Sequence, residues 1–339
     1  MVLKAELHCH IEGAASVRLV QRKAARYGVD VSGFIRGDKF VWHDFTSFLD
    51  AYDQSSMLFR TAEDYADLAE DYLLALGRQD CIYSEVFIST DHAITAGLHP
   101  RAYIEGLAEG MYRAKAATGI EGRLVATGLR HKGPDAVLAA ARYIVENPHP
   151  LVTGFGMAGD ERIHRPSDFA AAFNLARDAG LGITVHAGEL SGWESVASAL
   201  DALAPSRIGH GVRAIENPDL VKKLAEEEIV LECCPGSNIA LGVYADFAAH
   251  PFPALARAGV PVTLNSDDPP YFHTNLAREY AVAATDFGYD EEELTAVTAT
   301  ALNAAFIDEE TRRSLLERLS SDKTVRAVDD IFAGSASSG

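Results

Sequence analysis

Residues 6–13 have the sequence Glu6-Leu7-His8-Cys9-His10-Ile11-Glu12-Gly13. The alternation in this run, which breaks at Gly13, predicts a short β-strand that ends in a turn. Side chains two positions apart on a strand point to the same side, so His8 and His10 project together. Two neutral imidazoles held in this way can bind a divalent metal ion such as zinc. With 12 histidines in the chain, one His-x-His pair is close to a chance occurrence, so the pair needs support from other residues.

Seven further β-rich segments follow, and residues with helical patterning separate each one from the next. Their ranges are 81–88, 122–129, 151–157, 181–186, 207–211, 229–234 and 260–265. Strands that alternate with helices pair in parallel, and eight of them predict an α/β fold, the closed (β/α)8 TIM barrel. The alternative is an open doubly wound sheet. No Gly-x-Gly-x-x-Gly follows the first strand, which weakens the dinucleotide-binding form of that alternative.

Two regions lie outside this alternation of strands and helices. An aromatic-rich insertion follows the first strand and contains Phe45, Phe48 and Leu49. It is either a helix pair buried against the main body or a helical apolar lid over a pocket. Residues 276–319 are helical in pattern and predict extra C-terminal helices outside the barrel. We expect one domain over residues 1–333 and a disordered tail over residues 334–339, which are small and polar.

Composition narrows the class of protein. There are 30 Lys and Arg against 49 Asp and Glu, so the formal net charge is −19, and such a surface repels nucleic acids and anionic membranes. No apolar run reaches membrane-spanning length, and the N-terminus lacks a signal-peptide pattern. The four cysteines have no framework spacing, which predicts reduced thiols in a cytoplasm. The sequence gives no interface signal, so monomer and dimer are both open.

Ligand-type residues recur at or near the C-terminal ends of the predicted strands, where barrel enzymes build their active sites. They are His8, His10, His186, His210, Asp267 and Asp268. Three imidazoles and a carboxylate satisfy a zinc-like ion and leave a position for water, whose pKa the metal would lower until it supplies hydroxide near neutral pH. Glu189, three residues after His186, is placed to donate or shuttle a proton.

Each of these residues also has a structural interpretation. A lone histidine is more often a hydrogen-bonded core residue, Asp267-Asp268-Pro269 alone is turn chemistry, and Glu189 alone is a solvated loop acid. Four separate strand ends that all finish in ligand-type residues favour the metal site. The fourth strand contains no lysine that could be modified to bridge two metals, so we expect one metal ion per chain. The absence of Cys-x-x-Cys excludes the small zinc deaminases that use this motif.

Five motifs together resemble the adenosine and adenine deaminases, a family of zinc-dependent barrel enzymes. They are His8-Cys9-His10-Ile11-Glu12-Gly13, Ala158-Gly159-Asp160-Glu161, His186-Ala187-Gly188-Glu189, Arg207-Ile208-Gly209-His210-Gly211 and Asn265-Ser266-Asp267-Asp268-Pro269. They occur in the family's order between residue 6 and about residue 270. The resemblance implies hydrolytic replacement of the 6-amino group of a purine by oxygen, with release of ammonia.

The resemblance also implies roles for individual residues. Glu189 would protonate the ring nitrogen next to the attacked carbon, and His210 would orient and stabilise the zinc-bound hydroxide. The zinc ligands would be His8, His10, His186 and Asp267.

The remaining contacts implied by the resemblance concern the purine itself. Asp268 would accept a hydrogen bond from the five-membered-ring side, and the Gly159 amide would hold the remaining ring nitrogen. Three residues are similar to the family's apolar gate, namely Phe45, Phe48 and Leu49.

Glu12 departs from the adenosine type, in which an aspartate at this position touches the ribose. Glutamate is common in relatives that act on adenine or on modified adenosine-like compounds, whereas Ile208-Gly209-His210-Gly211 followed by Val212 is more like the adenosine type. We therefore expect adenosine as substrate, converted to inosine, with adenine or a modified purine as the alternative. A metal-dependent amide or ester hydrolase and a metal-free purine-binding protein are less favoured.

Overall fold

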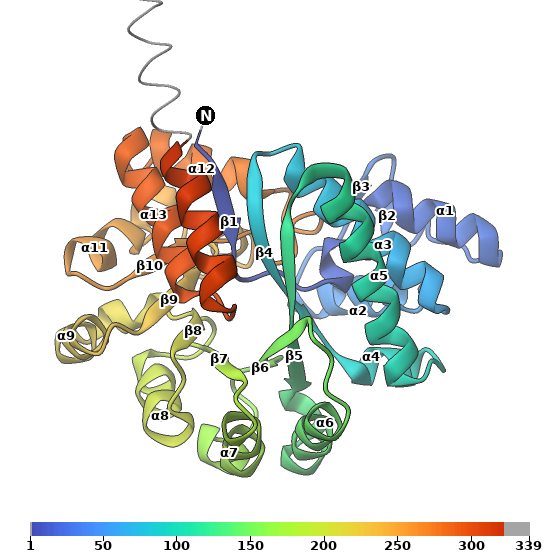
Figure 1. Cartoon of the computed structure of the whole chain (residues 1–339), viewed down its shortest axis with the longest axis horizontal. Coiled ribbons are helices and arrows are strands. Elements are labelled where there is room, and N and C mark those ends of the chain that lie inside the picture. The colour runs from blue at the N-terminus through green and yellow to red at the C-terminus, as the bar shows by residue number, and fades with distance from the viewer. Residues whose placement is uncertain (1, 322–339) are drawn as a thin grey trace, which may run out of the picture.

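The computed structural model describes residues 2–321. Its main sheet has eight parallel strands in the order β1-β4-β5-β6-β7-β8-β9-β10 (Figure 1). The strands are β1 (Lys4–Glu6), β4 (Cys81–Ile88), β5 (Glu121–Leu129), β6 (Val152–Ala158), β7 (Gly182–Ala187), β8 (Arg207–His210), β9 (Val230–Cys233) and β10 (Val262–Leu264). A parallel bridge between Cys9 and Asp267 joins the first strand to the last. The predicted (β/α)8 barrel is confirmed, and the open doubly wound alternative is wrong.

Helices surround this barrel on the outside (Figure 1). They are α1 (Val17–Tyr27), α2 (Phe45–Ser56), α3 (Ala62–Gly77), α4 (Thr90–Thr95), α5 (Pro100–Thr118), α6 (Pro134–Glu146), α7 (Ala170–Asp178), α8 (Trp193–Leu203), α9 (Pro218–Glu226), α10 (Pro235–Ala240), α11 (Phe252–Arg257), α12 (Leu276–Thr285) and α13 (Glu291–Ala304). Residues 309–321 are also helical. Local sequence explains several starts: the Asn217 side chain caps α9 and Pro218 occupies its first turn.

The first strand differs from the prediction. Regular pairing is confined to β1, and the following residues instead bond alternately to the two neighbouring strand ends. The His10 amide donates to the Asp267 carbonyl at 3.0 Å, and the Ile11 amide donates to the Phe87 carbonyl at 3.0 Å. The His-x-His segment therefore links the ends of β4 and β10 and closes the barrel between them.

The insertion after β1 contains the predicted helix, α2, together with a short hairpin that was not predicted. The hairpin pairs β2 (Ile35–Arg36) with β3 (Lys39–Phe40) in antiparallel fashion. The expected extra helices after residue 276 are present as α12, α13 and residues 309–321. The single domain over residues 1–333 stays a prediction, and the tail over residues 334–339 lies outside the described residues.

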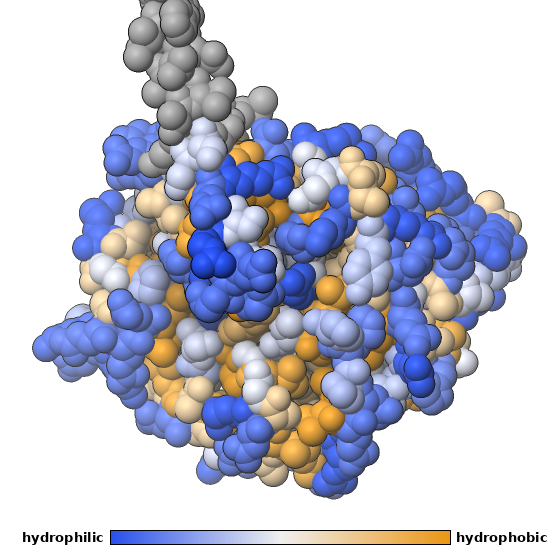
Figure 2. Space-filling model, viewed as in Figure 1, coloured by the Kyte–Doolittle hydropathy of each residue, from blue (hydrophilic) through white to orange (hydrophobic). Residues whose placement is uncertain are grey.

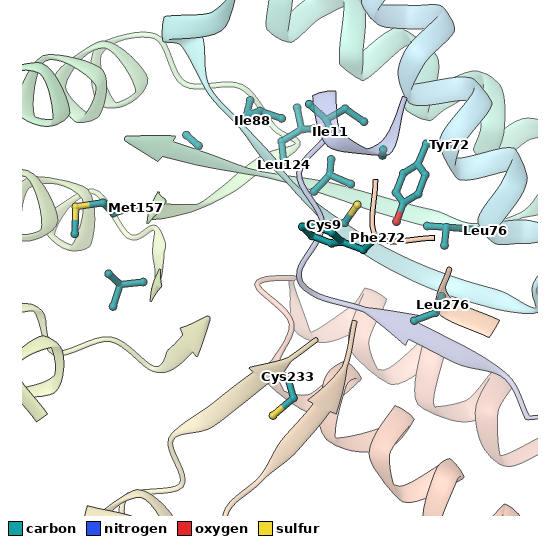
Figure 3. Close-up of a cluster of buried hydrophobic side chains, with 14 of the residues drawn as sticks. Cys9, Ile11, Tyr72, Leu76, Ile88, Leu124, Met157, Cys233, Phe272 and Leu276 are labelled. Atoms are coloured by element: carbon teal, nitrogen blue, oxygen red, sulfur yellow. The ribbon is translucent and has the colours of Figure 1, made fainter. Parts of the chain in front are cut away.

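Buried apolar side chains fill the space between the barrel and its helices. Figure 3 shows part of this core, where Cys9 and Ile11 lie among side chains of α3, β4 and β5 such as Tyr72, Ile88 and Leu124. On the face shown in Figure 2, hydrophilic side chains gather around the edge and hydrophobic ones toward the middle. Across the described residues no helix combines the length and apolar character needed to cross a bilayer.

The barrel interior also contains a buried charge network. Arg207 is 1% exposed, and its guanidinium pairs with Glu85 at 2.5 Å and with Glu232 at 2.6 Å. The ring of Phe306, which follows α13, lies 3.5 Å from the guanidinium carbon. This ring also packs on β6 and β7, where Gly182 leaves room for it.

The substitution Gly182→Ala is expected to destabilise the fold by about 1–3 kcal/mol, because the added Cβ would overlap the Phe306 ring. Urea unfolding measures this change. The matched control is Gly33→Ala, whose Cβ would have no neighbour within 4 Å. A Gly182→Ala protein as stable as this control would contradict the packing role of Phe306.

Candidate active site

Four predicted metal ligands converge at the C-terminal ends of β1, β7 and β10. One ligand atom from each of His8, His10, His186 and Asp267 lies within 4.8 Å of every other. The Nε2 atoms of His10 and His186 are 3.2 Å apart, and Asp267 Oδ1 lies 3.4 Å from His10 Nε2 and 3.6 Å from His8 Nε2. The sequence therefore identified a set of residues that the fold brings together.

The hydrogen bonds of the imidazole Nδ1 atoms favour a cation bound at the Nε2 atoms. His8 Nδ1 donates to Glu232 Oε2 at 2.8 Å, and His186 Nδ1 donates to the Met157 carbonyl at 3.0 Å. These bonds leave both Nε2 lone pairs pointing inward, and His8 Nε2 is buried without a hydrogen-bond partner. Two such nitrogens beside a carboxylate match the donor set of a zinc-type ion.

The electrostatics of His8 lead to the same conclusion. Burial opposes a positive charge on this imidazole, yet the nearby carboxylates of Asp267 and Glu232 raise its pKa to about 9. Burial likewise opposes ionisation of Asp267, but the nearby imidazoles of His8, His210 and His10 hold the pKa of Asp267 below its usual range. The cluster therefore stabilises positive charge at its centre, as a metal site must.

The residues that orient this site were not predicted from the sequence. Glu232 lies inside the otherwise apolar strand β9, and an acid at such a position is the only local signal of its role. Ser237 on α10 donates to Asp267 Oδ2 at 2.6 Å, and Asn238 donates through Nδ2 to His210 Nδ1 at 3.3 Å. These contacts join segments that are 28 to 224 residues apart, so no local pattern could identify them.

His210 faces the metal cluster from the end of β8. Its Nδ1 accepts from Asn238, which leaves the proton on Nε2, and burial lowers its pKa to about 3. Nε2 lies 3.7 Å from Glu189 Oε1 and 3.9 Å from Asp267 Oδ2. A neutral imidazole that carries Nε2–H at this place can donate a hydrogen bond to an attacking oxygen.

Glu189 follows β7 and points into the same space. Its pKa is raised well above the usual value by burial and by the charges of Asp267 and Glu161. The side chain is 13% exposed. This pKa shift favours the protonated carboxyl group, which is the state that a general acid requires.

Asp268 lies beside this acid and is 6% exposed. Burial and the charges of Asp267 and Glu189 raise its pKa, and its Oδ1 is buried without a hydrogen-bond partner. The absence of a side chain at Gly13 leaves room for the Asp268 carboxyl group, because a Cβ on Gly13 would overlap Asp268 Oδ1. A buried, unpaired carboxyl oxygen is suited to a polar ligand atom.

Glu12 occupies the same end of the site and is 2% exposed. Its Oε1 accepts a hydrogen bond from the Tyr103 hydroxyl at 2.8 Å, and burial raises its pKa to about 7. Next to Glu12 in the chain, a Cβ on Gly13 would meet both Asp268 and Tyr52, so these side chains lie at the same end of the site. Gly159, at the end of β6, has a left-handed φ of 103° next to His131.

The predicted lid residues lie on α2. Phe48 is buried, with its ring 5.1 Å from Phe272 and 5.6 Å from Tyr271, which follow Asp268 closely in sequence. Phe45 packs on Phe48 at 6.0 Å, whereas Leu49 is 41% exposed. The structure therefore joins Phe48 to the segment carrying Asp268 and leaves Leu49 on the outer side.

A (β/α)8 barrel whose strand ends bring together three imidazoles, a carboxylate and a second buried acid has the architecture of a metal-dependent hydrolase. The family model described as adenosine deaminase matches residues 3–322. The chain belongs to the adenosine deaminase family.

Individual relatives define the branch of the family. An adenine deaminase of Chelativorans sp. strain BNC1 is 65% identical over 319 residues, which cover 94% of this chain and 98% of that protein. The crystal structure of an Arthrobacter aurescens adenine deaminase has a TM-score of 0.89 at 26% identity, covering 96% of this chain and all of the other. A Burkholderia ambifaria amidohydrolase with bound zinc has a TM-score of 0.88 at 25% identity, covering 98% and 93% of the chains.

These comparisons establish a hydrolase of the carbon–nitrogen bond of a purine, in a metal-dependent family. They also revise one expectation. The motifs favoured adenosine over adenine as the substrate, but the similar curated relatives are adenine deaminases. The alternative substrate is therefore better supported than the main one.

The substitution Glu189→Gln is expected to keep the bound metal and to lower kcat by at least about 100-fold, because the amide cannot donate the acid's proton. Steady-state turnover and metal analysis of the same preparation measure both effects. Glu194→Gln, at an exposed position of α8, is the matched control and is expected to behave like the wild type. Unchanged turnover in Glu189→Gln would rule out Glu189 as the acid.

Proposed function

We propose that this chain deaminates adenine: oxygen from water replaces the 6-amino group, and hypoxanthine and ammonia are the products. The observation that carries the proposal is identity of 57–65% to adenine deaminases over at least 93% of the chain. The burial of Glu12 on the side proposed for the sugar agrees with a substrate that has no ribose.

In the proposed mechanism, His8, His10, His186 and Asp267 would hold one zinc ion per chain. Such an ion would act as a Lewis acid that lowers the pKa of a water molecule. The residues behind the ligands orient them, since Glu232 and the Met157 carbonyl set the imidazole tautomers.

The chain's own groups then act on the purine. Glu189 gives its proton to the ring nitrogen next to the attacked carbon, because an aromatic amine leaves only after the ring is protonated and that carbon has become tetrahedral. His210 orients the attacking water through Nε2–H. Asp268 accepts a hydrogen bond from the five-membered ring, and the Gly159 amide holds the remaining ring nitrogen.

The remaining contacts select the substrate. The Tyr103 hydroxyl holds the Glu12 carboxyl group on the side where a ribose would extend. Phe45 and Phe48 form the apolar gate that separates the purine from bulk water, which strengthens the electrostatic interactions inside, whereas the exposed Leu49 lies on the outer side of α2.

The direct test is ammonia release from adenine and adenosine, measured side by side on protein with quantified zinc. Adenine is expected to turn over with a kcat/KM at least about 100-fold above that of adenosine. Turnover of adenosine alone would refute the proposal and would return the function to the adenosine type.

The substitution Glu12→Asp is expected to raise kcat/KM for adenosine relative to adenine by about 10-fold or more, because a shorter carboxyl group opens space of one methylene. The same ammonia assay on both purines measures the ratio. Glu12→Gln keeps the length of the side chain and is expected to give no such gain. An unchanged ratio in Glu12→Asp would show that Glu12 does not exclude the ribose.

A further inference from the structure

Four consecutive backbone amides in the loop after β7 converge on one carboxylate, that of Glu161. The Gly188 amide donates to Oε1, and the next three donate to Oε2: Glu189 at 3.1 Å, Leu190 at 2.9 Å and Ser191 at 3.0 Å. Hydrogen bonds from amides to a carboxylate are stronger than those between neutral groups. The partial positive charges of the amides stabilise a buried anion in the way that an anion-binding nest does.

Glu161 itself lies in an unusual environment. It follows β6 in a loop whose residues 162–165 are all exposed, yet it is only 4% exposed. A charged residue is rarely buried unless its charge is satisfied, and here the loop amides satisfy it. The buried Glu161 carboxylate therefore binds the loop of residues 188–191.

The bound loop has further constraints that fix its path. Gly188 has a left-handed φ of 72°, and a Cβ at this position would overlap Val196 on α8. On the carbonyl side, the Arg213 amide donates to the Gly188 carbonyl at 3.0 Å, and the Arg213 guanidinium donates to the Leu190 carbonyl at 3.3 Å. The amide side is held by Glu161.

We propose that Glu161 is a positioning residue for Glu189: its carboxylate fixes the loop of residues 188–191 so that the acid meets the purine ring nitrogen. The inference rests on the proposed function. Glu161 connects the loop after β6, which carries the Gly159 amide, to the loop after β7, which carries Glu189. It thereby sets the spacing between two groups that act on the same ring.

The expected size of the effect follows from geometry. A displacement of the acid by about 1 Å lowers the rate of proton transfer by about 100-fold, whereas weaker substrate binding is not required. Removal of Glu161 should therefore lower kcat more than it raises KM. A residue that only stabilised the fold would lower the amount of folded, metal-loaded protein and would leave kcat per bound metal unchanged.

The experiment compares Glu161→Ala and Glu161→Gln with Asp160→Asn. The neighbouring Asp160 pairs with Arg162 at 2.8 Å and does not bind the loop, so its substitution is the matched control. Glu161→Ala is expected to lower kcat per bound metal by about 100-fold with KM within about threefold. The kcat of Glu161→Gln should fall between those of the wild type and Glu161→Ala, because the remaining side-chain oxygen still accepts hydrogen bonds from the loop amides. Glu161→Gln also serves in place of Glu161→Ala if that variant does not fold.

Two further measurements separate positioning from stability. Hydrogen exchange of the amides of residues 188–191 should be faster in both Glu161 variants and unchanged in Asp160→Asn. In a Glu189→Gln background, Glu161→Ala should cost less than about threefold in kcat, because the group that it positions is already lost.

Three results would overturn the proposal: an unchanged kcat per bound metal in Glu161→Ala, a loss explained by KM or metal content, or an undiminished loss in the Glu189→Gln background. Exchange and metal content need no substrate, so they report on the loop independently of the purine. If the wild type deaminates another purine instead of adenine, the proposed function fails, and the same comparison with that purine still decides the role of Glu161.

Discussion

The site depends on the hydrogen bond between His8 Nδ1 and Glu232, at 2.8 Å inside the barrel. Glu232 remains charged there because the Arg207 guanidinium and the His8 bond offset the effect of burial, which leaves its pKa below the usual value. Arg207 is in turn shared with Glu85. Glu232, which contacts both Arg207 and His8, therefore places a buried negative charge behind His8, and this charge favours a cation at the candidate metal site.

Strained backbone at two strand ends also helps to position side chains at the candidate metal site. His210 and Asp267 both have left-handed φ values, 59° and 64°, which cost residues with side chains about 1–3 kcal/mol each. The short helix α10 holds both side chains, through Ser237 and Asn238. Glu279 accepts the Gly236 amide at 2.9 Å and so fixes the start of that helix. Strained residues that neighbouring hydrogen bonds hold in place are typical of pre-organised active sites.

Most of the fold and the candidate ligands could be predicted because their signals are local. Strands such as β7 contain a short apolar run, and His186 stands where that run ends. The hairpin of β2 and β3 was missed because strands of two residues carry no periodicity. Glu232 and Glu161 could not be assigned, because their partners are determined by barrel closure: His8 is 224 residues from Glu232, and the loop amides are 27 to 30 residues from Glu161.

The choice between adenine and adenosine was unpredictable for a related reason. Sequence shows that Glu12 is one methylene longer than aspartate, a difference that alone discriminates by about 1–3 kcal/mol. In the structure Glu12 is also tied to Tyr103, which lies 91 residues away. To admit a ribose, the carboxyl group would have to leave a buried hydrogen bond, and an unpaired buried partner costs about 1–3 kcal/mol more. The discrimination against adenosine proposed for Glu12 therefore arises from its hydrogen bond to Tyr103 as well as from the length of its side chain. A side chain of the same size without this bond could rotate away from the ribose.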